Sequence, residues 1–183
     1  MRFTETEIEG AFVVDIEPRE DDRGFFARAY CVQELEEMGL HATMVQANLS
    51  GNRTRGTVRG LHYQEEPAVE RKLFRCIRGA TFHAVVDMRP DSETYLGWVG
   101  VELSAESKRA LYVPALCATG YQALADEAEV LYLVSAYYSP EHERGVRYDD
   151  PAIGIEWPLE VTSVSEKDLA WPTVGTPAAG ARG

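Results

Sequence analysis

Short runs of apolar and aromatic residues recur along the chain, and glycine, proline, aspartate and serine separate them. Their length and their richness in valine, tyrosine, phenylalanine and leucine are typical of β-strands. The expected strands are residues 11–16 (AFVVDI), 57–63 (TVRGLHY), 72–77 (KLFRCI), 81–88 (TFHAVVDM), 98–103 (WVGVEL), 110–115 (ALYVPA) and 129–138 (EVLYLVSAYY). This pattern predicts a mainly all-β fold, an antiparallel β-sandwich of the jelly-roll type.

A few short helices are expected beside these strands. Residues 32–40 (VQELEEMGL) place Leu35 and Met38 on one side of a helix, and Gly39 supplies its stop. A second helix is expected after Ser165, because the segment SEKD offers a capping serine and acidic residues in the first turn.

The 183 residues fit one domain, and no repeat or linker interrupts the range 1–183. Residues 172–183 are rich in glycine, proline and alanine and are expected to form a flexible tail. The net charge of −12 argues against a nucleic-acid partner, since such binding depends on neutralising phosphates. No apolar run approaches the roughly 18 residues of a membrane-spanning helix, so no membrane partner is expected.

The cysteines and the amino terminus bear on the compartment. Cys31, Cys76 and Cys117 are odd in number and widely spaced, which argues against a disulfide framework or a thiolate zinc site. The acidic amino terminus lacks the basic start and apolar centre of a secretory signal. A reducing cytoplasm is therefore the expected location.

One histidine lies in the segment RGTVRGLHYQ (55–64), within an expected strand. His62 could be a metal ligand, a catalytic base or a structural residue. Metal-binding jelly rolls usually supply a second histidine two residues further on, where this chain has Gln64. They supply a third on a later strand, which is read here as LYVPALCATGYQAL (111–124) and has Thr119 at that position. A metal is therefore not expected here.

Polar and basic side chains crowd this strand and the next more than a core strand needs. They are Arg59, His62, Gln64, Arg71, Lys72, Arg75 and Arg78. In a regular strand Arg59 and His62 would face opposite sides, so a bulge at Gly60 is needed to bring both to one site.

Seven segments between residues 21 and 168 form one ordered pattern. They are DDRGFF (21–26), VQANLS (45–50), RGTVRGLHYQ (55–64), ERKLFRCIRGA (70–80), VDMRPDSETYLGWVGVELS (86–104), EVLYLVSAYYSPEHERGVRYDDPAIGIEWP (129–158) and VSEKD (164–168). With these segments the chain resembles the dTDP-4-dehydrorhamnose 3,5-epimerase family of nucleotide-sugar enzymes. The resemblance implies a cupin-like jelly roll, usually a homodimer with exchanged strands, without metal or organic cofactor. It also implies epimerisation of a dTDP-linked 4-keto-6-deoxyhexose through an enediolate-like intermediate.

The chemistry of this reaction explains the residue types that the resemblance assigns. Removing a proton beside a ketone needs a base on one face, a partner for the oxygen that becomes negative, and an acid on the other face. By resemblance, His62 is the base, Asp168 holds that histidine, Tyr132 donates the proton and Lys72 lies near the ketone oxygen.

The resemblance also implies a set of substrate-binding positions. They are Arg23, Phe25, Gln46, Asn48, Arg59, Tyr138, Glu143 and Lys167. Basic side chains suit a diphosphate, and an aromatic side chain such as Tyr138 suits the thymine.

Three further positions of the expected site depart from the family pattern. Thr119 in ALCATGYQ replaces a histidine, His83 in TFHAVVD replaces an aspartate, and Arg28 in FFARAY replaces a glutamate. The first two are expected close to Lys72, where two alternatives stay open: a protonated His83 would lower the pKa of the lysine, or His83 stays neutral and donates a hydrogen bond. This change is expected to alter which carbon is deprotonated, or how well.

The sequence therefore favours an isomerase that epimerises C3, C5 or both carbons of a nucleotide-linked 4-keto-6-deoxyhexose. Two alternatives stay open: a ketoisomerase on a nucleotide-linked keto sugar, and a sugar-nucleotide-binding protein without turnover. The fold cannot choose among them, because function depends on the site.

Overall fold

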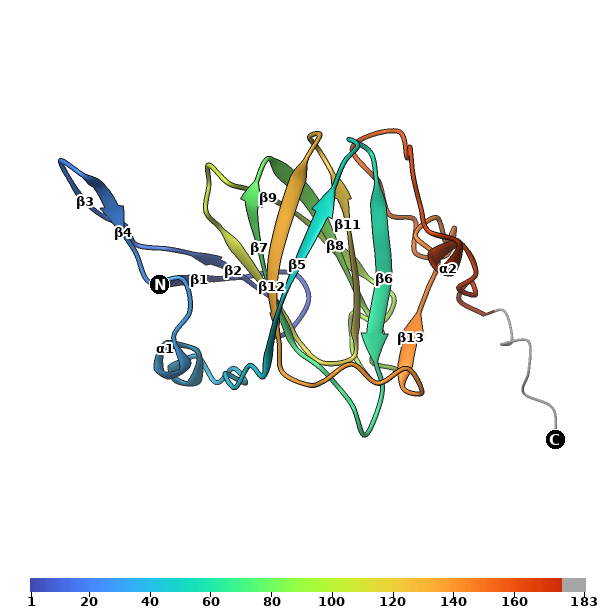
Figure 1. Ribbon diagram of the computed structural model, residues 1–183. Helices are drawn as coiled ribbons and strands as arrows, with labels where there is room; N and C mark the ends of the chain where they lie inside the picture. The colour runs from blue at the N-terminus through green and yellow to red at the C-terminus, as the bar shows by residue number, and fades with distance from the viewer. Residues whose placement is uncertain (176–183) are drawn as a thin grey trace.

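Two antiparallel β-sheets packed face to face form the body of the computed structural model, which describes residues 1–175 (Figure 1). The six-stranded sheet has the order β1 (Arg2–Glu5), β2 (Phe12–Asp15), β10 (Ala110–Val113), β7 (Lys72–Arg78), β12 (Ala128–Val134) and β5 (Gln46–Asn52). The five-stranded sheet has the order β13 (Glu143–Gly145), β6 (Val58–Gln64), β11 (Cys117–Ala123), β8 (Ala80–Asp87) and β9 (Trp98–Ser104). The predicted β-sandwich of the jelly-roll type is confirmed.

Apolar side chains from both sheets meet in the space between them. Phe74, Leu111 and Val130 come from the six-stranded sheet, and Val85 and Leu103 come from the five-stranded sheet. Fully burying such a side chain contributes roughly 1.5–3 kcal/mol, so this layer holds the two sheets together. The cavity described below lies at one end of the same layer.

Three small elements lie outside the sandwich. The hairpin of β3 (Arg19–Asp21) and β4 (Gly24–Phe26) extends away from the body, near α1 (Val32–Glu37) (Figure 1). The helix α2 (Glu166–Leu169) lies on the other side of the molecule, against β6. Both expected helices are present, and Ser165 caps α2 by accepting a hydrogen bond from the backbone N–H of Asp168.

The chain between residues 110 and 123 forms two strands rather than one. β10 pairs with β2 and β7 in the six-stranded sheet, whereas β11 pairs with β6 and β8 in the other. A turn at Leu116, whose φ is 58°, carries the chain from one sheet to the other. This crossing places Thr119 beside β6, opposite His62.

The expected tail is partly tied to the domain. The backbone N–H of Arg147 donates to the carbonyl oxygen of Pro172, and that of Val174 donates to the buried carboxylate of Asp150. A buried carboxylate needs such donors, and for residues 172–175 the flexible tail stays a prediction. The remainder of that prediction falls on residues 176–183, which lie outside the described residues.

Candidate active site

Two adjoining cavities lie at the end of the sandwich next to α2. The first has a volume of about 310 Å³ and is lined by Ser50, Arg59, His62, Lys72, Phe74, Thr119, Gly120, Tyr121, Tyr132, Ser165, Lys167 and Asp168. The second, of about 370 Å³, is lined by Gln46, Asn48, His62, Tyr63, Gln64, Glu70, Lys72, Tyr132, Val134, Ala136, Tyr138, Glu143 and Lys167. Four side chains line both, which makes the two cavities one continuous site: His62, Lys72, Tyr132 and Lys167.

A bulge in β6 brings Arg59 and His62 to the same cavity. His62 lies opposite Thr119 and Arg59 lies opposite Tyr121, so β6 has one more residue than β11 between these pairs. Gly60 occupies the bulge with a φ of 125°, and a Cβ atom there would lie 2.4 Å from the Cα of Gly120. The bulge expected at Gly60 is therefore confirmed, and only glycine fits it.

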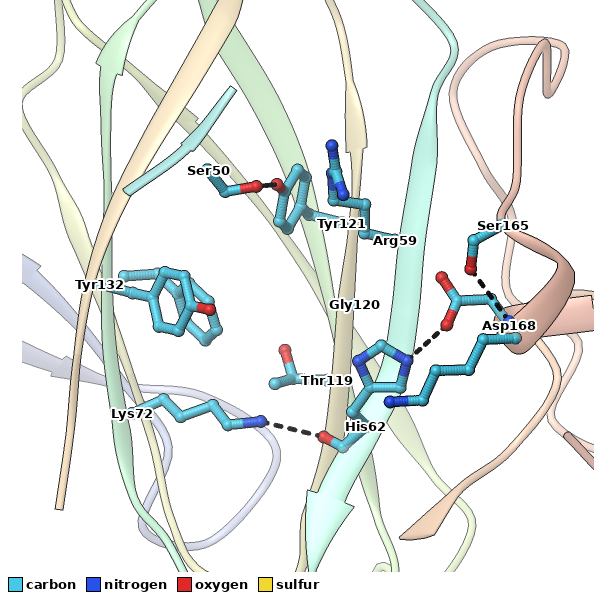
Figure 2. A pocket seen from close by; sticks show the side chains of 12 residues that line it. Ser50, Arg59, His62, Lys72, Thr119, Gly120, Tyr121, Tyr132, Ser165 and Asp168 are labelled. Carbon is cyan, nitrogen blue, oxygen red and sulfur yellow. Dashed lines mark hydrogen bonds and ion pairs between the residues drawn. The ribbon is translucent and has the colours of Figure 1, made fainter. Parts of the chain in front are cut away.

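His62 and Asp168 form a close pair at the cavity wall (Figure 2). The distance from Nε2 of His62 to Oδ1 of Asp168 is 2.6 Å. A carboxylate only accepts hydrogen bonds, so Nε2 carries a proton, and in the neutral tautomer of the ring Nδ1 keeps a lone pair. Figure 2 shows Nδ1 on the cavity side of the ring. The neutral ring is thus oriented as a base toward the cavity.

The short helix α2 holds the carboxylate of this pair in place. Oδ2 of Asp168 also accepts the backbone N–H of Gly60 at 3.3 Å, and Ser165 caps the helix. Burial is the largest single influence and pushes the pKa of Asp168 upward, but the interactions with His62, the backbone N–H of Gly60 and Ser165 together leave that pKa below its usual value. Asp168 is therefore ionised at neutral pH and favours a positive charge on His62.

Lys72 approaches the cavity from the start of β7. Its Nζ donates to the carbonyl oxygen of His62 at 3.2 Å and lies 2.8 Å from Oε1 of Glu70. Both side chains of this ion pair are nearly buried, with exposed fractions of 11% for Lys72 and 12% for Glu70. Glu70 was not expected from the sequence, and it supplies the negative charge that a buried ammonium group needs.

Tyr132 faces His62 from the opposite sheet (Figure 2). Its ring stacks on Phe74, with ring centroids 5.1 Å apart. Burial raises the pKa of Tyr132, and the neighbouring Tyr121 and Glu70 act in the same direction. The phenol therefore keeps its proton through the neutral range, which suits a proton donor.

Thr119 lines the first cavity as expected, but His83 does not. The side chain of His83 is fully buried behind the rings of Phe74 and Tyr121, at centroid distances of 5.0 and 5.1 Å. Nε2 of His83 lies 3.0 Å from Oγ1 of Thr81, and burial lowers the pKa of His83 to about 3. Of the two alternatives for His83, the neutral ring agrees with this environment, because burial disfavours the charged form of an imidazole.

Ser50 of β5 and Tyr121 of β11, which the sequence did not predict as site residues, join Arg59 of β6 at one end of the first cavity. Nε of Arg59 donates to Oδ1 of Asn52 at 2.8 Å, and Oγ of Ser50 lies 2.7 Å from the hydroxyl of Tyr121. The signal was the polar alternation in QANLSGN, which places Gln46, Asn48, Ser50 and Asn52 on one face of β5. That segment lacks the apolar residues by which strands were recognised.

Comparison with known protein families identifies the family of this chain. The family model described as dTDP-4-dehydrorhamnose 3,5-epimerase matches residues 5–175. The chain belongs to this family. This result confirms the assignment expected from the motifs of the sequence, and the class of enzyme expected with it, an isomerase.

Individual members of the epimerase family are similar over nearly the whole chain. The dTDP-4-dehydrorhamnose 3,5-epimerase of Methanothermobacter thermautotrophicus is 42% identical, over 93% of this chain and 92% of its own length. The dTDP-4-dehydrorhamnose 3-epimerase of Streptomyces niveus is 40% identical, over 92% of this chain and 81% of its own. A crystal structure of the dTDP-6-deoxy-D-glucose-3,5-epimerase of Legionella pneumophila in complex with dTDP-4-keto-L-rhamnose has a TM-score of 0.88 and 36% identity, covering 94% and 92% of the two chains.

The second cavity contains the other family positions expected to bind the nucleotide. Nε2 of Gln46 donates to Oδ1 of Asn48 at 2.7 Å, while Glu143 accepts hydrogen bonds from Tyr138 at 2.8 Å and Lys167 at 2.6 Å. Burial is the largest single influence and raises the pKa of Glu143, but the hydrogen bonds from Lys167 and Tyr138 and the charge of Lys167 together hold that pKa below its usual value. Lys167 is thus a cation with an exchangeable partner at the boundary of the two cavities.

Besides His83, three of the expected site positions do not lie in either cavity of the single chain. Arg23 pairs with Asp21 in the hairpin at 2.6 Å, and the ring of Phe25 lies 5.0 Å from Nζ of Lys108. Arg28 pairs with Glu34 at 2.5 Å. The physical reason is that β3 and β4 pair only with each other and extend from the sandwich on the side away from α2 (Figure 1).

Two further findings concern other classes of function. Within residues 1–175, no group of three or more histidine, cysteine, aspartate or glutamate side chains is placed to hold a metal ion. In the same range no helix has the length and apolar character needed to cross a membrane.

Proposed function

We propose that this protein epimerises a dTDP-linked 4-keto-6-deoxyhexose at a carbon next to the ketone. One observation carries the proposal: the His62–Asp168 pair faces Tyr132 across a cavity that also contains Lys72. A base and an acid on opposite faces of a sugar ring are what inversion of a carbon requires. The names of the relatives support the same substrate class.

The first step breaks a carbon–hydrogen bond. Nδ1 of His62 takes the proton, and the electron pair of that bond moves onto the ketone oxygen to form an enolate. Asp168, ionised and 2.6 Å from Nε2, stabilises the resulting imidazolium. The ammonium group of Lys72 stabilises the oxygen that becomes negative, in a cavity where little water weakens the interaction.

The second step returns a proton to the opposite face. The phenol of Tyr132 donates its proton to the carbon, the carbonyl re-forms, and the configuration is inverted. Tyr132 and His62 then exchange protons with solvent to restore their starting states. C3 and C5 both lie next to the C4 ketone, so the same pair of groups serves either carbon once the sugar is placed for it.

The second cavity suits the nucleotide. A diphosphate would compete with Glu143 for Lys167, and the ring of Tyr138, 5.6 Å from Nζ of Lys167, would stack on the base. We propose this side for Gln46, Asn48, Tyr138, Glu143 and Lys167. Arg59 serves the first cavity.

We also propose that the protein acts as a homodimer whose hairpins complete the sites. Phe25 and Phe26 of the β3–β4 hairpin have exposed fractions of 52% and 75%, which is unfavourable for a hairpin surrounded by water. Exchange of this hairpin between two chains would cover both rings and bring Arg23 and Arg28 to the partner's cavity. A loss of affinity for dTDP on deleting residues 19–26 would agree with this arrangement.

Deuterium exchange tests the proposed reaction directly. The protein is incubated with dTDP-4-keto-6-deoxyglucose in D₂O, and deuterium at C3 and C5 is followed by mass spectrometry and NMR. Uptake at both carbons indicates a 3,5-epimerase, and uptake at one carbon indicates a single-site epimerase. A displaced carbonyl group would favour the ketoisomerase instead. Absence of exchange in protein that binds dTDP would favour a binding protein and overturn the proposal.

A further inference from the structure

A second phenol, that of Tyr121, lies in the first cavity beside the proposed catalytic groups (Figure 2). The exposed fraction of Tyr121 is 5%, so its ring has little freedom to move. The neutral ring of His83 packs behind it, on the directly opposite position of β8. Tyr121 is therefore a rigid part of the cavity wall, while its hydroxyl proton can point to different hydrogen-bond acceptors.

The side-chain amide of Asn52 limits which hydrogen bonds the hydroxyl of Tyr121 can make. Oδ1 of Asn52 accepts from Nε of Arg59 at 2.8 Å, and a guanidinium group only donates. Nδ2 of Asn52 donates to the carbonyl oxygen of Ala128 at 3.1 Å, and a carbonyl group only accepts. The amide therefore has one orientation, in which Nδ2 also donates to the hydroxyl of Tyr121 at 3.3 Å.

The hydrogen bond between Tyr121 and Ser50 can also be assigned a donor and an acceptor. The phenol has one proton and two acceptors within reach: Oγ of Ser50 at 2.7 Å and Oδ1 of Asn52 at 3.4 Å. Either oxygen of the 2.7 Å contact could be the donor, but donation by Ser50 would leave the phenol proton only Oδ1 of Asn52, which is more distant and already accepts from Arg59. The direction from Tyr121 to Ser50 is therefore favoured. The hydroxyl proton of Ser50 then cannot point to Tyr121, and Ser50 lines the cavity. This proton is left to point at whatever occupies the cavity.

We propose that Tyr121 is a positioning residue that turns the hydroxyl of Ser50 into a hydrogen-bond donor toward the substrate. The inference rests on the proposed function and names the recognised group: an acceptor oxygen, carried either by the diphosphate or by the sugar. Arg59 lies at the same end and uses two of its five N–H groups on Asn52 and Gly51. This end of the cavity therefore offers donors to its ligand, which favours a negatively charged or carbonyl oxygen over a donor group.

Calorimetric titration of the full chain with dTDP and with dTDP-glucose tests the proposal. dTDP-glucose has no ketone, so it measures binding without turnover. Tyr121→Phe removes one oxygen atom and leaves the proton of Ser50 free to turn away. We expect Tyr121→Phe and Ser50→Ala each to weaken binding about tenfold, as for one lost hydrogen bond to a charged or polar ligand. We expect the double variant to bind no more weakly than Ser50→Ala alone.

Tyr112→Phe is the matched control, because the phenol of Tyr112 is also buried and donates to the carbonyl oxygen of His41 at 3.0 Å, outside both cavities. It should lower stability as Tyr121→Phe does and leave binding of both ligands unchanged. If Tyr121→Phe binds both dTDP and dTDP-glucose more weakly, the acceptor oxygen belongs to the diphosphate. If it binds only dTDP-glucose more weakly, the acceptor oxygen belongs to the sugar.

Unchanged binding in Tyr121→Phe overturns the inference, and so do additive losses in the double variant, since Tyr121 would then not act through Ser50. Failure of the unmodified protein to bind either ligand would instead refute the proposed function.

Discussion

Two histidines of the five-stranded sheet, His62 on β6 and His83 on β8, have opposite environments although only β11 separates their strands. The side chain of His62 is 30% exposed and lies against a carboxylate, whereas that of His83 is fully buried and lies against the hydroxyl of Thr81. A carboxylate stabilises an imidazolium, while burial among rings prevents one from forming. The comparison teaches that in this protein the neighbours of a histidine, more than its strand, decide whether it can move protons.

The largest expected effect comes from removing the reactive histidine. His62→Ala should lower the rate of deuterium exchange by roughly 10²–10⁴, the usual contribution of a general base, and leave calorimetric binding of dTDP within a few fold. His83→Gln should retain exchange within about tenfold, since it keeps a neutral polar group in a place without ligand contact. Equal losses of the exchange rate in the two variants would contradict a functional difference between His62 and His83.

The partner of His62 comes next. Asp168→Asn should lower exchange roughly a hundredfold, because an amide neither holds the base in the same tautomer nor stabilises its charge. Asp149→Asn serves as the control, since Asp149 pairs with Arg147 at 2.7 Å and lines neither cavity. A full rate in Asp168→Asn would mean that His62 does not depend on its carboxylate.

The buried ring of His83 should affect how protein stability depends on pH, rather than the rate of deuterium exchange. The pKa of His83 is about 3 in the folded protein and near 6.5 when unfolded. As the pH falls below 6.5 the unfolded chain gains a proton that the folded chain does not, so stability present above that pH is lost toward pH 3. Between pH 7 and 5 this loss is about 2 kcal/mol.

Urea unfolding at pH 7 and pH 5 measures this loss. In His83→Gln the pH-dependent part should disappear, so the difference in unfolding free energy between the two pH values shrinks by about 2 kcal/mol. In His41→Gln, a change at an exposed position, the pH-dependent part of the unfolding free energy should remain. The carboxyl of Asp168 does not interfere, because its lowered pKa places its contribution below about pH 4. An unchanged pH dependence in His83→Gln would show that His83 is not buried as a neutral ring.

The smallest effect is expected at the cap of α2. Ser165→Ala should cost about 1 kcal/mol of stability and lower exchange a few fold, because the helix that carries Asp168 loses its hydrogen bond. Ser107→Ala also removes a serine that accepts a backbone N–H, that of Ser104, but in a distant turn. It should leave exchange unchanged, and a reduced rate there would mean that the effect at Ser165 is not specific to the helix.

Much of the fold could be predicted because buried strands in this chain are locally apolar. Runs such as 72–77 and 81–88 correspond closely to β7 and β8, and the cap at Ser165 lies where its sequence pattern indicated. β5 was missed because its polar face lines the cavity. The segment 110–123 was read as one strand because no local signal states which sheet a strand joins.

The sequence by itself determined the sandwich and the family, and it indicated that His62, Lys72, Tyr132 and Asp168 belong to one site, since ordered motifs and residue types carry that information. Only the tertiary structure decided that Arg59 and His62 share one side of β6. It also decided that Glu70 pairs with Lys72, that the hydroxyl of Tyr121 contacts that of Ser50, and that His83 is a neutral residue behind the wall. The physical reason is that strand register, burial and charge pairing depend on residues far apart in the chain, and local patterns do not contain them.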